Sequence, residues 1–196
     1  LDDGDEISGL DDIADGDASA RKLTKDGPGL LVLSGTNSYT GATVLASGVL
    51  RASGAALPAT SLLQFNNATV ANGGVLEAAG TFTRSIGSAG GNVQWNNHGG
   101  FAATAAGLTV TLNNDAATPI NWAGGAAVGL NNKYLVLNST TAAGKVEVTN
   151  NFDLNNNQVV YVLDNPAETA DYAELSGVIA DGSGSRSLTK QGPGLL

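Results

Sequence analysis

The stretch Leu23–Val44 reads LTKDGPGLLVLSGTNSYTGATV, and its pattern is the strongest indication of the architecture of the chain. Its apolar segments, Leu30–Leu33 and Thr43–Leu45, are short and are separated by glycine, proline and asparagine. Glycine adopts backbone angles that other residues avoid, and proline fixes φ and lacks an amide donor, so both favour sharp corners. The stretch therefore predicts short strands joined by tight turns. The predicted corner residues are Gly27, Pro28, Gly29, Gly35 and Gly41.

A near copy of the start of this stretch returns at the end of the sequence. Residues 23–31 read LTKDGPGLL and residues 188–196 read LTKQGPGLL, so eight of nine positions are identical. Self-similarity of this kind is the signature of repeat architectures. We predict one repeat unit over residues 1–162 and the start of the next unit over residues 163–196. The corner residues of the second copy are Gly192, Pro193 and Gly194.

Short segments of alternating apolar and polar residues recur along the whole chain, and no stretch has helical periodicity. Most are bounded by glycine, of which there are 27, or by asparagine, and both residues tolerate positive φ. These patterns predict an all-β chain. The predicted strands are Leu30–Leu33, Thr43–Leu45, Val49–Ala52, Leu62–Phe65, Val75–Ala78, Val93–Trp95, Leu108–Leu112, Ile120–Trp122, Tyr134–Leu137, Lys145–Val148 and Val159–Leu163.

Many short strands fit a sandwich, a barrel or a solenoid, but three features favour the solenoid. Tight hairpin signals are scarce, and Asn72-Gly73 is the main one. The apolar residues are mostly Ala, Val and Leu, which suit the narrow interior of stacked coils. A repeat with open ends also suits an array in which each coil contacts only its neighbours. At roughly 20 to 25 residues per coil, we expect about eight or nine coils.

Residues 23–44, continued by Ser47–Ala52, resemble the autotransporter-associated β-strand repeat, also called the passenger-associated transport repeat. The shared pattern is a Leu-Thr-Lys start, a Gly-x-Gly turn, a Leu/Val strand ending in Ser-Gly, then Asn-x-Tyr-Thr-Gly and a Thr-rich strand. The resemblance implies a right-handed parallel β-helix in a bacterial protein that is secreted or displayed at the cell surface. It also implies structural, adhesive or secretion-assisting roles.

Charge and composition exclude several classes of function. The chain has 18 acidic and 9 basic residues, so its net charge of −9 repels polyanions such as nucleic acid. It has no cysteine, and no apolar segment reaches the roughly 20 residues that a membrane-spanning helix requires. We expect no nucleic-acid partner and no membrane span in this segment, and the resemblance implies an extracellular or cell-surface location in a bacterium. Because the sequence starts at Leu1 without a signal peptide, we expect part of a longer protein.

Acidic residues gather near the N-terminus, and carboxylates at turns can bind Ca²⁺. Their spacing matches neither an EF-hand loop nor the Gly-rich nonapeptide Ca²⁺ repeat, so a solvated loop is the alternative. No other cofactor is expected. The candidate Ca²⁺ ligands are Asp11, Asp12, Asp15 and Asp17.

Aromatic residues form a candidate ligand platform. Trp95 and Trp122, together with Phe101 and Tyr134, could stack against sugars, and the alternative is that they fill the core. His98 is the only histidine, and no neighbouring residue points to a catalytic triad or a metal site, so we interpret it as a turn residue. Two segments fit the acceptor pattern for N-glycosylation. They begin at Asn67 and Asn138.

Charges are sparse between residues 50 and 145, which argues against a catalytic groove lined by carboxylates. We therefore expect no enzymatic activity. The leading hypothesis is a structural segment of a large extracellular protein, a rod, fibre or stalk that joins end to end with copies of itself or with adjacent repeat units. The alternative is an adhesin passenger module that binds glycans or cell-surface partners.

Overall fold

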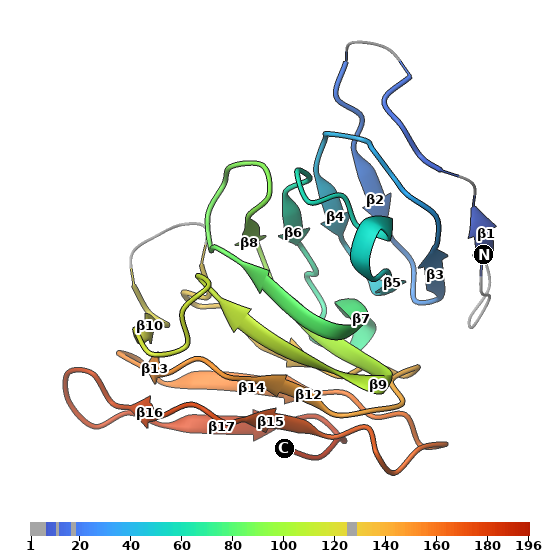
Figure 1. The fold of residues 1–196 in the computed structure, drawn as a ribbon. Coiled ribbons are helices and arrows are strands. Elements are labelled where there is room, and N and C mark those ends of the chain that lie inside the picture. Colours follow the sequence, from blue (N-terminus) through green and yellow to red (C-terminus); the bar gives the residue numbers. More distant parts are fainter. Residues whose placement is uncertain (1–6, 11, 17–18, 125–128) are drawn as a thin grey trace.

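Every pair of neighbouring strands runs parallel in the part of the chain that the structure describes. The structure is a computed structural model that describes residues 7–10, 12–16, 19–124 and 129–196 (Figure 1). Within these residues the only helical turns are two short 3₁₀ turns, η1 (Gly54–Ala56) and η2 (Val70–Asn72). No helix there is long and apolar enough to cross a membrane.

The strands are short, with two exceptions, and they form three sheets. The largest sheet has ten strands, eight of which follow the order β1-β3-β5-β7-β9-β11-β14-β17. The others have the orders β2-β4-β6-β8 and β10-β13-β16. The strands are β1 (Ile7–Leu10), β2 (Leu23–Lys25), β3 (Leu30–Leu33), β4 (Thr43–Leu45), β5 (Gly48–Arg51), β6 (Leu63–Phe65), β7 (Gly73–Arg84), β8 (Val93–Trp95), β9 (Gly99–Leu112), β10 (Ile120–Asn121), β11 (Leu135–Leu137), β12 (Val146–Val148), β13 (Phe152–Asp153), β14 (Gln158–Val162), β15 (Ala173–Leu175), β16 (Ile179–Ala180) and β17 (Leu188–Gln191).

The pairing pattern shows that the chain winds in coils. The first half of β9 pairs with β11 and its second half pairs with β12, so two successive strands stack on one long strand. The strands that follow β9, β12 and β15 along the chain are also stacked in parallel, because β10 pairs with β13 and β13 pairs with β16. Parallel strands that return to the same sheet after each circuit define a parallel β-helix. The all-β solenoid fold predicted from the sequence is confirmed, whereas its handedness and its number of coils stay predictions.

Coil length varies along the axis. Leu50 lies opposite Leu76 and Leu76 opposite Phe101, which are 26 and 25 residues further along the chain. The shortest of these steps joins Leu31 to Leu50 over 19 residues, and the longest joins Phe101 to Leu137 over 36 residues. Loops of different length therefore leave the coils without changing which side chains are stacked.

The interior holds a ladder of apolar residues and an aromatic cluster. Leu50, Leu76, Phe101 and Leu137 stack in register and are all completely buried. Around Phe101 the ring centroids of Phe65 and Phe82 lie 5.2 and 4.8 Å away. The interior therefore contains large rings as well as the small aliphatic side chains expected from composition.

The predicted corner glycines are needed for two different reasons. Gly27 has a φ of 78°, a conformation that L side chains rarely adopt. Gly41 has no positive φ, but a Cβ atom there would lie 2.2 Å from the carbonyl oxygen of Arg21 in the preceding coil. Gly35 and Gly192 are of the first kind and Gly194 is of the second.

The two copies of the Leu-Thr-Lys motif lie in different sheets. The first copy forms β2 of the four-stranded sheet, whereas the second forms β17 at the end of the ten-stranded sheet. The boundary predicted between residues 162 and 163 is spanned by the pairing of β14 with β17. The division into units at this point therefore stays a prediction.

Candidate functional site

The last coil, residues 163–196, exposes apolar side chains and the edges of its strands. In the described residues, β15, β16 and β17 each pair on one side only, with β12, β13 and β14. All large hydrophobic side chains that are exposed in the described residues lie in this coil, at the lower end of Figure 1. They are Tyr172, Val178, Ile179, Leu195 and Leu196.

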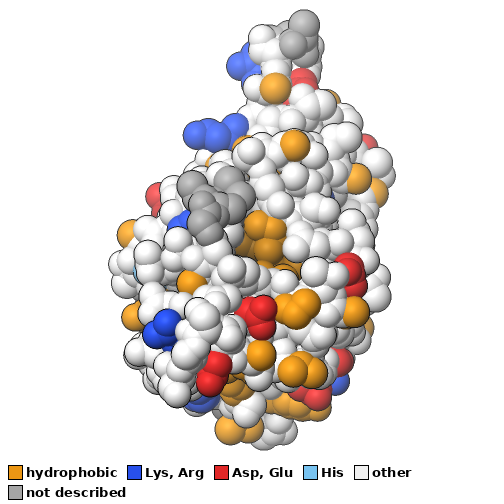
Figure 2. All heavy atoms as spheres, turned by 90° about the vertical axis from the view of Figure 1, so that its left-hand side faces the viewer, with side chains coloured by type: hydrophobic (Ala, Val, Ile, Leu, Met, Phe, Trp, Pro, Cys, Tyr) orange, Lys and Arg blue, Asp and Glu red, His pale blue; other side chains and the backbone are white. Residues whose placement is uncertain are grey.

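One face of the molecule, shown in Figure 2, carries small hydrophobic areas interspersed with acidic and basic side chains. Several of these hydrophobic areas lie at its lower end, where the last coil is placed. Exposed apolar groups that gather at one place mark an interaction surface more often than scattered ones do. Within the described residues, the exposed large hydrophobic side chains are therefore concentrated in the coil that contains residues 163–196.

The lysine of the Leu-Thr-Lys motif joins two coils. Lys25 is only 6% exposed, and its Nζ atom donates to the carbonyl oxygens of Asp26 at 3.0 Å, Gly27 at 2.6 Å and Ser47 at 3.2 Å. Asp26 and Gly27 belong to the turn after β2, whereas Ser47 belongs to the turn of the next coil. Burial lowers the pKa of Lys25. Sequence reasoning missed this contact, although the lysine recurs in both copies of the motif.

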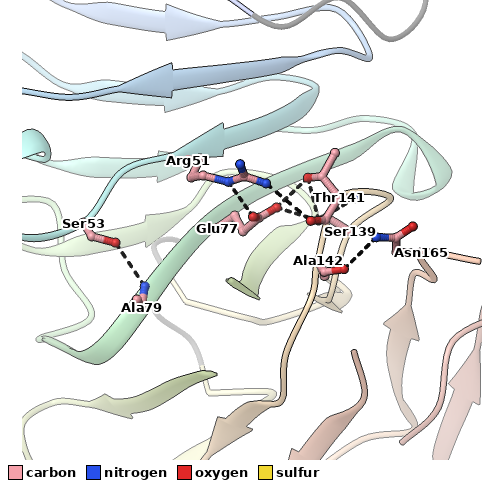
Figure 3. Close-up of polar contacts among 8 residues, drawn as sticks. All are labelled: Arg51, Ser53, Glu77, Ala79, Ser139, Thr141, Ala142 and Asn165. Carbon is pink, nitrogen blue, oxygen red and sulfur yellow. Dashed lines mark hydrogen bonds and ion pairs between the residues drawn. The ribbon is translucent and has the colours of Figure 1, made fainter. Parts of the chain in front are cut away.

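A buried carboxylate holds a loop against the ten-stranded sheet (Figure 3). Glu77 on β7 is completely buried, and its Oε1 atom accepts a hydrogen bond of 2.7 Å from Nε of Arg51 on β5. Its Oε2 atom accepts bonds from the hydroxyls of Ser139 at 3.0 Å and Thr141 at 2.5 Å, in the loop after β11. Both oxygens of the carboxylate are therefore occupied by partners that lie up to 64 residues away.

This loop, residues 138–143, covers a second apolar cluster on the side of the sheet that faces away from the interior. Side chains alternate between the two faces of a strand, so Val75 lies on one face and Leu76 on the other. Asn165 Nδ2 donates to the carbonyl oxygen of Ala142 over 2.8 Å and ties the loop to the following coil. The cluster consists of Val49, Val75, Ala102, Val136, Ala142 and Leu163.

The aromatic platform predicted at Trp95 and Trp122 is wrong. Both side chains have no exposed surface, because they point into the interior of the solenoid. Trp95 Nε1 donates to the carbonyl oxygen of Gly99 at 2.8 Å, and the Trp122 ring packs 5.1 Å from that of Phe152. The alternative prediction, that these residues fill the core, is correct.

Two of the four candidate Ca²⁺ ligands connect the first loop to the next coil. Asp12 Oδ1 accepts a hydrogen bond of 2.7 Å from the Thr36 amide, and Asp15 Oδ2 accepts one of 2.6 Å from the Thr40 hydroxyl. The bond from Thr40 is the main reason why the pKa of Asp15 is lowered. The described residues contain no group of three or more His, Asp or Glu side chains that could hold a metal ion. The other two candidates, Asp11 and Asp17, lie outside the described residues, so the Ca²⁺ site stays a prediction.

His98 connects two coils through its backbone and its ring. Its backbone exchanges two hydrogen bonds of 3.1 Å with Asn67, and its Nδ1 atom accepts a bond of 3.0 Å from the Tyr134 amide. Burial lowers the pKa of the imidazole, which favours the neutral form that this bond requires. The residue therefore has a role in the fold, in line with its interpretation as a turn residue.

Both asparagines of the glycosylation acceptor patterns are buried. Asn67 is 2% exposed, and its Nδ2 atom donates to the carbonyl oxygens of Thr69 at 2.9 Å and Gly73 at 2.6 Å. Asn138 has no exposed surface, and its Nδ2 atom donates to the carbonyl oxygen of Asp171. The nitrogen that would carry a glycan is therefore inaccessible at both positions in the folded chain.

Parallel strands in stacked coils, corner glycines and buried links between coils define a β-solenoid protein. Residues 23–52, which span β2 to β5, match the family described as Passenger-associated-transport-repeat. The chain thus contains a segment that matches a passenger-associated transport repeat, and this match covers 30 of its 196 residues. No curated protein and no solved structure matches the chain.

Proposed function

We propose that this chain is a structural segment of a larger extracellular bacterial protein, in which it forms part of a rod, fibre or stalk. The observation that carries the proposal is the continuous interior, which stacks in register from Leu31 on β3 to Val162 on β14. In such an array each coil is stabilised by its neighbours, so length is gained by adding coils. Reach and stability are therefore the properties that this architecture provides.

The buried ionisable groups support a structural role rather than catalysis. Lys25 is held by carbonyl oxygens, and Glu77 by an arginine and two hydroxyls. Asp171 Oδ2 accepts a hydrogen bond of 2.8 Å from the Asn165 amide. Lys25 and Glu77 link segments of different coils, whereas Asp171 closes the loop between β14 and β15. We therefore expect no enzymatic activity from the chain.

The structural role is preferred to the adhesin alternative because the two tryptophans predicted to contact sugars are buried. Trp95 and Trp122 cannot offer a stacking surface without opening the core. The net charge of −9 argues in addition against nucleic acid as a partner. Among the described residues, the exposed large hydrophobic side chains include only one aromatic ring, that of Tyr172.

Electron microscopy of bacterial cells that carry the parent protein tests this proposal. An antibody raised against the 196-residue chain should label stalks or filaments on intact cells, and protease added to these cells should remove the label. Labelling that appears only after lysis would contradict an extracellular role. Saturable binding of the purified chain on a glycan array would favour the adhesin alternative instead.

A further inference from the structure

The second half of β7, Gly80–Arg84, pairs with another strand on one side only in the described part of the chain. It pairs with residues Leu108 to Leu112 of β9, whereas β5 pairs with the first half of β7 and no further than Glu77. The chain that leaves β5 forms a loop that contains η1, residues 52–60, instead of a strand beside Gly80–Arg84. One coil in the middle of the solenoid therefore leaves a gap in the sheet.

Hydrogen bonds bound this gap at both ends. At one end the Ala79 amide donates to Oγ of Ser53 over 3.0 Å, as Figure 3 shows. At the other end the Val93 amide donates to the carbonyl oxygen of Ser85 over 2.9 Å. The gap is therefore confined to the edge of Gly80–Arg84.

Two threonines direct their backbone groups into the gap. The carbonyl oxygen of Arg84 accepts from the Asn113 amide over 3.0 Å, so the backbone of Arg84 bonds toward β9. Successive residues of a parallel strand bond toward opposite sides, so the amides and carbonyl oxygens of Thr81 and Thr83 face away from β9. Both threonines are exposed, and no strand of the described residues pairs with them there. Such an edge is a template for the main chain of another polypeptide.

A cavity of about 280 Å³ lies along this edge. Buried apolar residues line it, among them Leu57, Leu76 and Phe82, and the exposed Thr81 and Thr83 lie at its rim. The volume is at the lower limit of the roughly 300–1,000 Å³ of small-molecule sites, so it suits one or two side chains. Side chains of an added strand that point inward would enter this cavity, because they alternate between the two faces of a sheet.

Arg84 gives the cavity a positive charge. It is the only charged residue among the described residues that line the cavity. Its guanidinium donates to the carbonyl oxygens of Ser61 at 2.6 Å and Pro58 at 3.0 Å, and in the described residues no carboxylate forms an ion pair with it. Burial lowers the pKa of Arg84. A carboxylate in the cavity would supply the missing opposite charge and accept charge-assisted hydrogen bonds.

We propose that the edge Gly80–Arg84 is a docking site for an extended, acidic peptide segment of another protein, which adds as a strand in the gap. The main chain of this segment bonds with Thr81 and Thr83, as in other cases of strand addition. An apolar side chain enters the cavity opposite Phe82, and a carboxylate two residues further along meets the Arg84 guanidinium. This site goes beyond the proposed structural role, because it gives the rod a place to hold a partner along its side.

NMR titration of the 196-residue chain with the peptide acetyl-Thr-Val-Thr-Glu-Thr-amide tests the proposal. At saturation we expect the amides of Thr81 and Thr83 to exchange with solvent at least about fivefold more slowly. The same peptide with glutamine in place of glutamate should bind about tenfold more weakly to the unmodified chain, since hydrogen bonds between charged groups are the stronger ones. The two peptides should bind equally to Arg84→Gln, because the charge that distinguishes them is gone.

A matched pair of variants tests the main-chain contact. Thr83→Pro removes an amide that faces the gap but no bond to β9, and proline is tolerated on a free strand edge, so this variant should fold and lose binding. Thr83→Val keeps the amide and should bind as the unmodified chain does. Melting temperatures of both variants report folding. If Thr83→Pro does not fold, the comparison of the two peptides on Arg84→Gln decides.

Three results would overturn the proposal. The first is that the amides of Thr81 and Thr83 do not respond to the peptide. The second is that the peptides with glutamate and glutamine bind the unmodified chain equally well. The third is that glucuronate alone protects these amides as well as the peptide does, which would indicate a site for acidic sugars. Each of these results would leave the cell-surface role, tested by microscopy, unaffected.

Discussion

The Arg51 guanidinium and the Glu77 carboxylate lie one coil apart on adjacent strands and are joined by a hydrogen bond of 2.7 Å. The arginine side chain is 33% exposed, whereas the glutamate is completely buried. Since the loop over residues 138–143 contacts the same carboxylate, this pair couples the sheet to the segment that covers it.

Glu77→Ala should lower the free energy of unfolding by about 3 kcal/mol, as removal of one partner of a buried pair does. The loss lies at the lower end of the usual range because Arg51 can be solvated once it is released. Urea unfolding followed by circular dichroism measures the change. Glu168→Ala, at an exposed position, is the matched control and should change stability by less than about 0.5 kcal/mol. Equal losses in the two variants would show that Glu77 does not anchor the loop.

Trp95→Ala should destabilise the chain by about 3–5 kcal/mol, because it leaves a cavity beside Phe65 and Phe101. Trp95→Phe retains most of the packing and should cost less. Thermal unfolding of both variants, with exposed Tyr172→Ala as the control, checks this order. If Trp95→Ala melts at the temperature of the unmodified chain, the ring cannot belong to the core.

Acidification should weaken the fold through His98. Burial lowers the pKa of its imidazole below 6.5, so the unfolded chain takes up this proton more readily than the folded chain does. The stability that depends on neutral His98 is complete above about pH 6.5 and is lost as the pH falls toward the lower, folded-state pKa. The lowered pKa values of Asp15 and Asp115, whose ordinary value is 3.8, act mainly below about pH 5, because the stability that such carboxylates contribute is lost progressively from there downward.

Unfolding in urea at several pH values between 5 and 7 measures this dependence. His98→Asn keeps an acceptor for the Tyr134 amide but does not titrate, so its stability should stay nearly constant over the same range. Parallel pH dependence in the variant and the unmodified chain would rule out His98 as the source.

Glycan transfer to Asn67 and Asn138 should require unfolding. A purified oligosaccharyltransferase incubated with the folded chain should leave its intact mass unchanged, because both side-chain amides are buried and hydrogen-bonded. The urea-unfolded chain should gain mass in the same reaction. Modification of the folded chain at either position would contradict the burial described above.

The sequence predicted the strands well wherever apolar and polar residues alternate between glycine or asparagine turns. Leu30–Leu33, Thr43–Leu45 and Val93–Trp95 have the predicted bounds. The second half of β7, Gly80–Arg84, was missed because its pairing with β9, rather than its own composition, makes it a strand. Leu23–Lys25 was missed for a similar reason, since it is stabilised as a strand by β4.

The links between coils could not be predicted in the same way. Glu77 and Ser139 are 62 residues apart, and no local pattern indicates that a loop returns to cover this carboxylate. Lys25 resembles an ordinary solvated residue at a strand end until the next coil brings the Ser47 carbonyl oxygen to it. The tryptophans gave an ambiguous signal, because a large ring suits a sugar platform and a core equally well until its exposure is known.

The long step between Phe101 and Leu137 has a consequence for how such chains can diversify. Although 36 residues separate these positions, they remain opposite each other, and the coils on either side keep their alignment. Residues inserted between the strands of one coil thus leave the stacking of the coils along the solenoid axis unchanged. A gene for such a protein can acquire new surface segments by insertion while the scaffold beneath them is inherited intact.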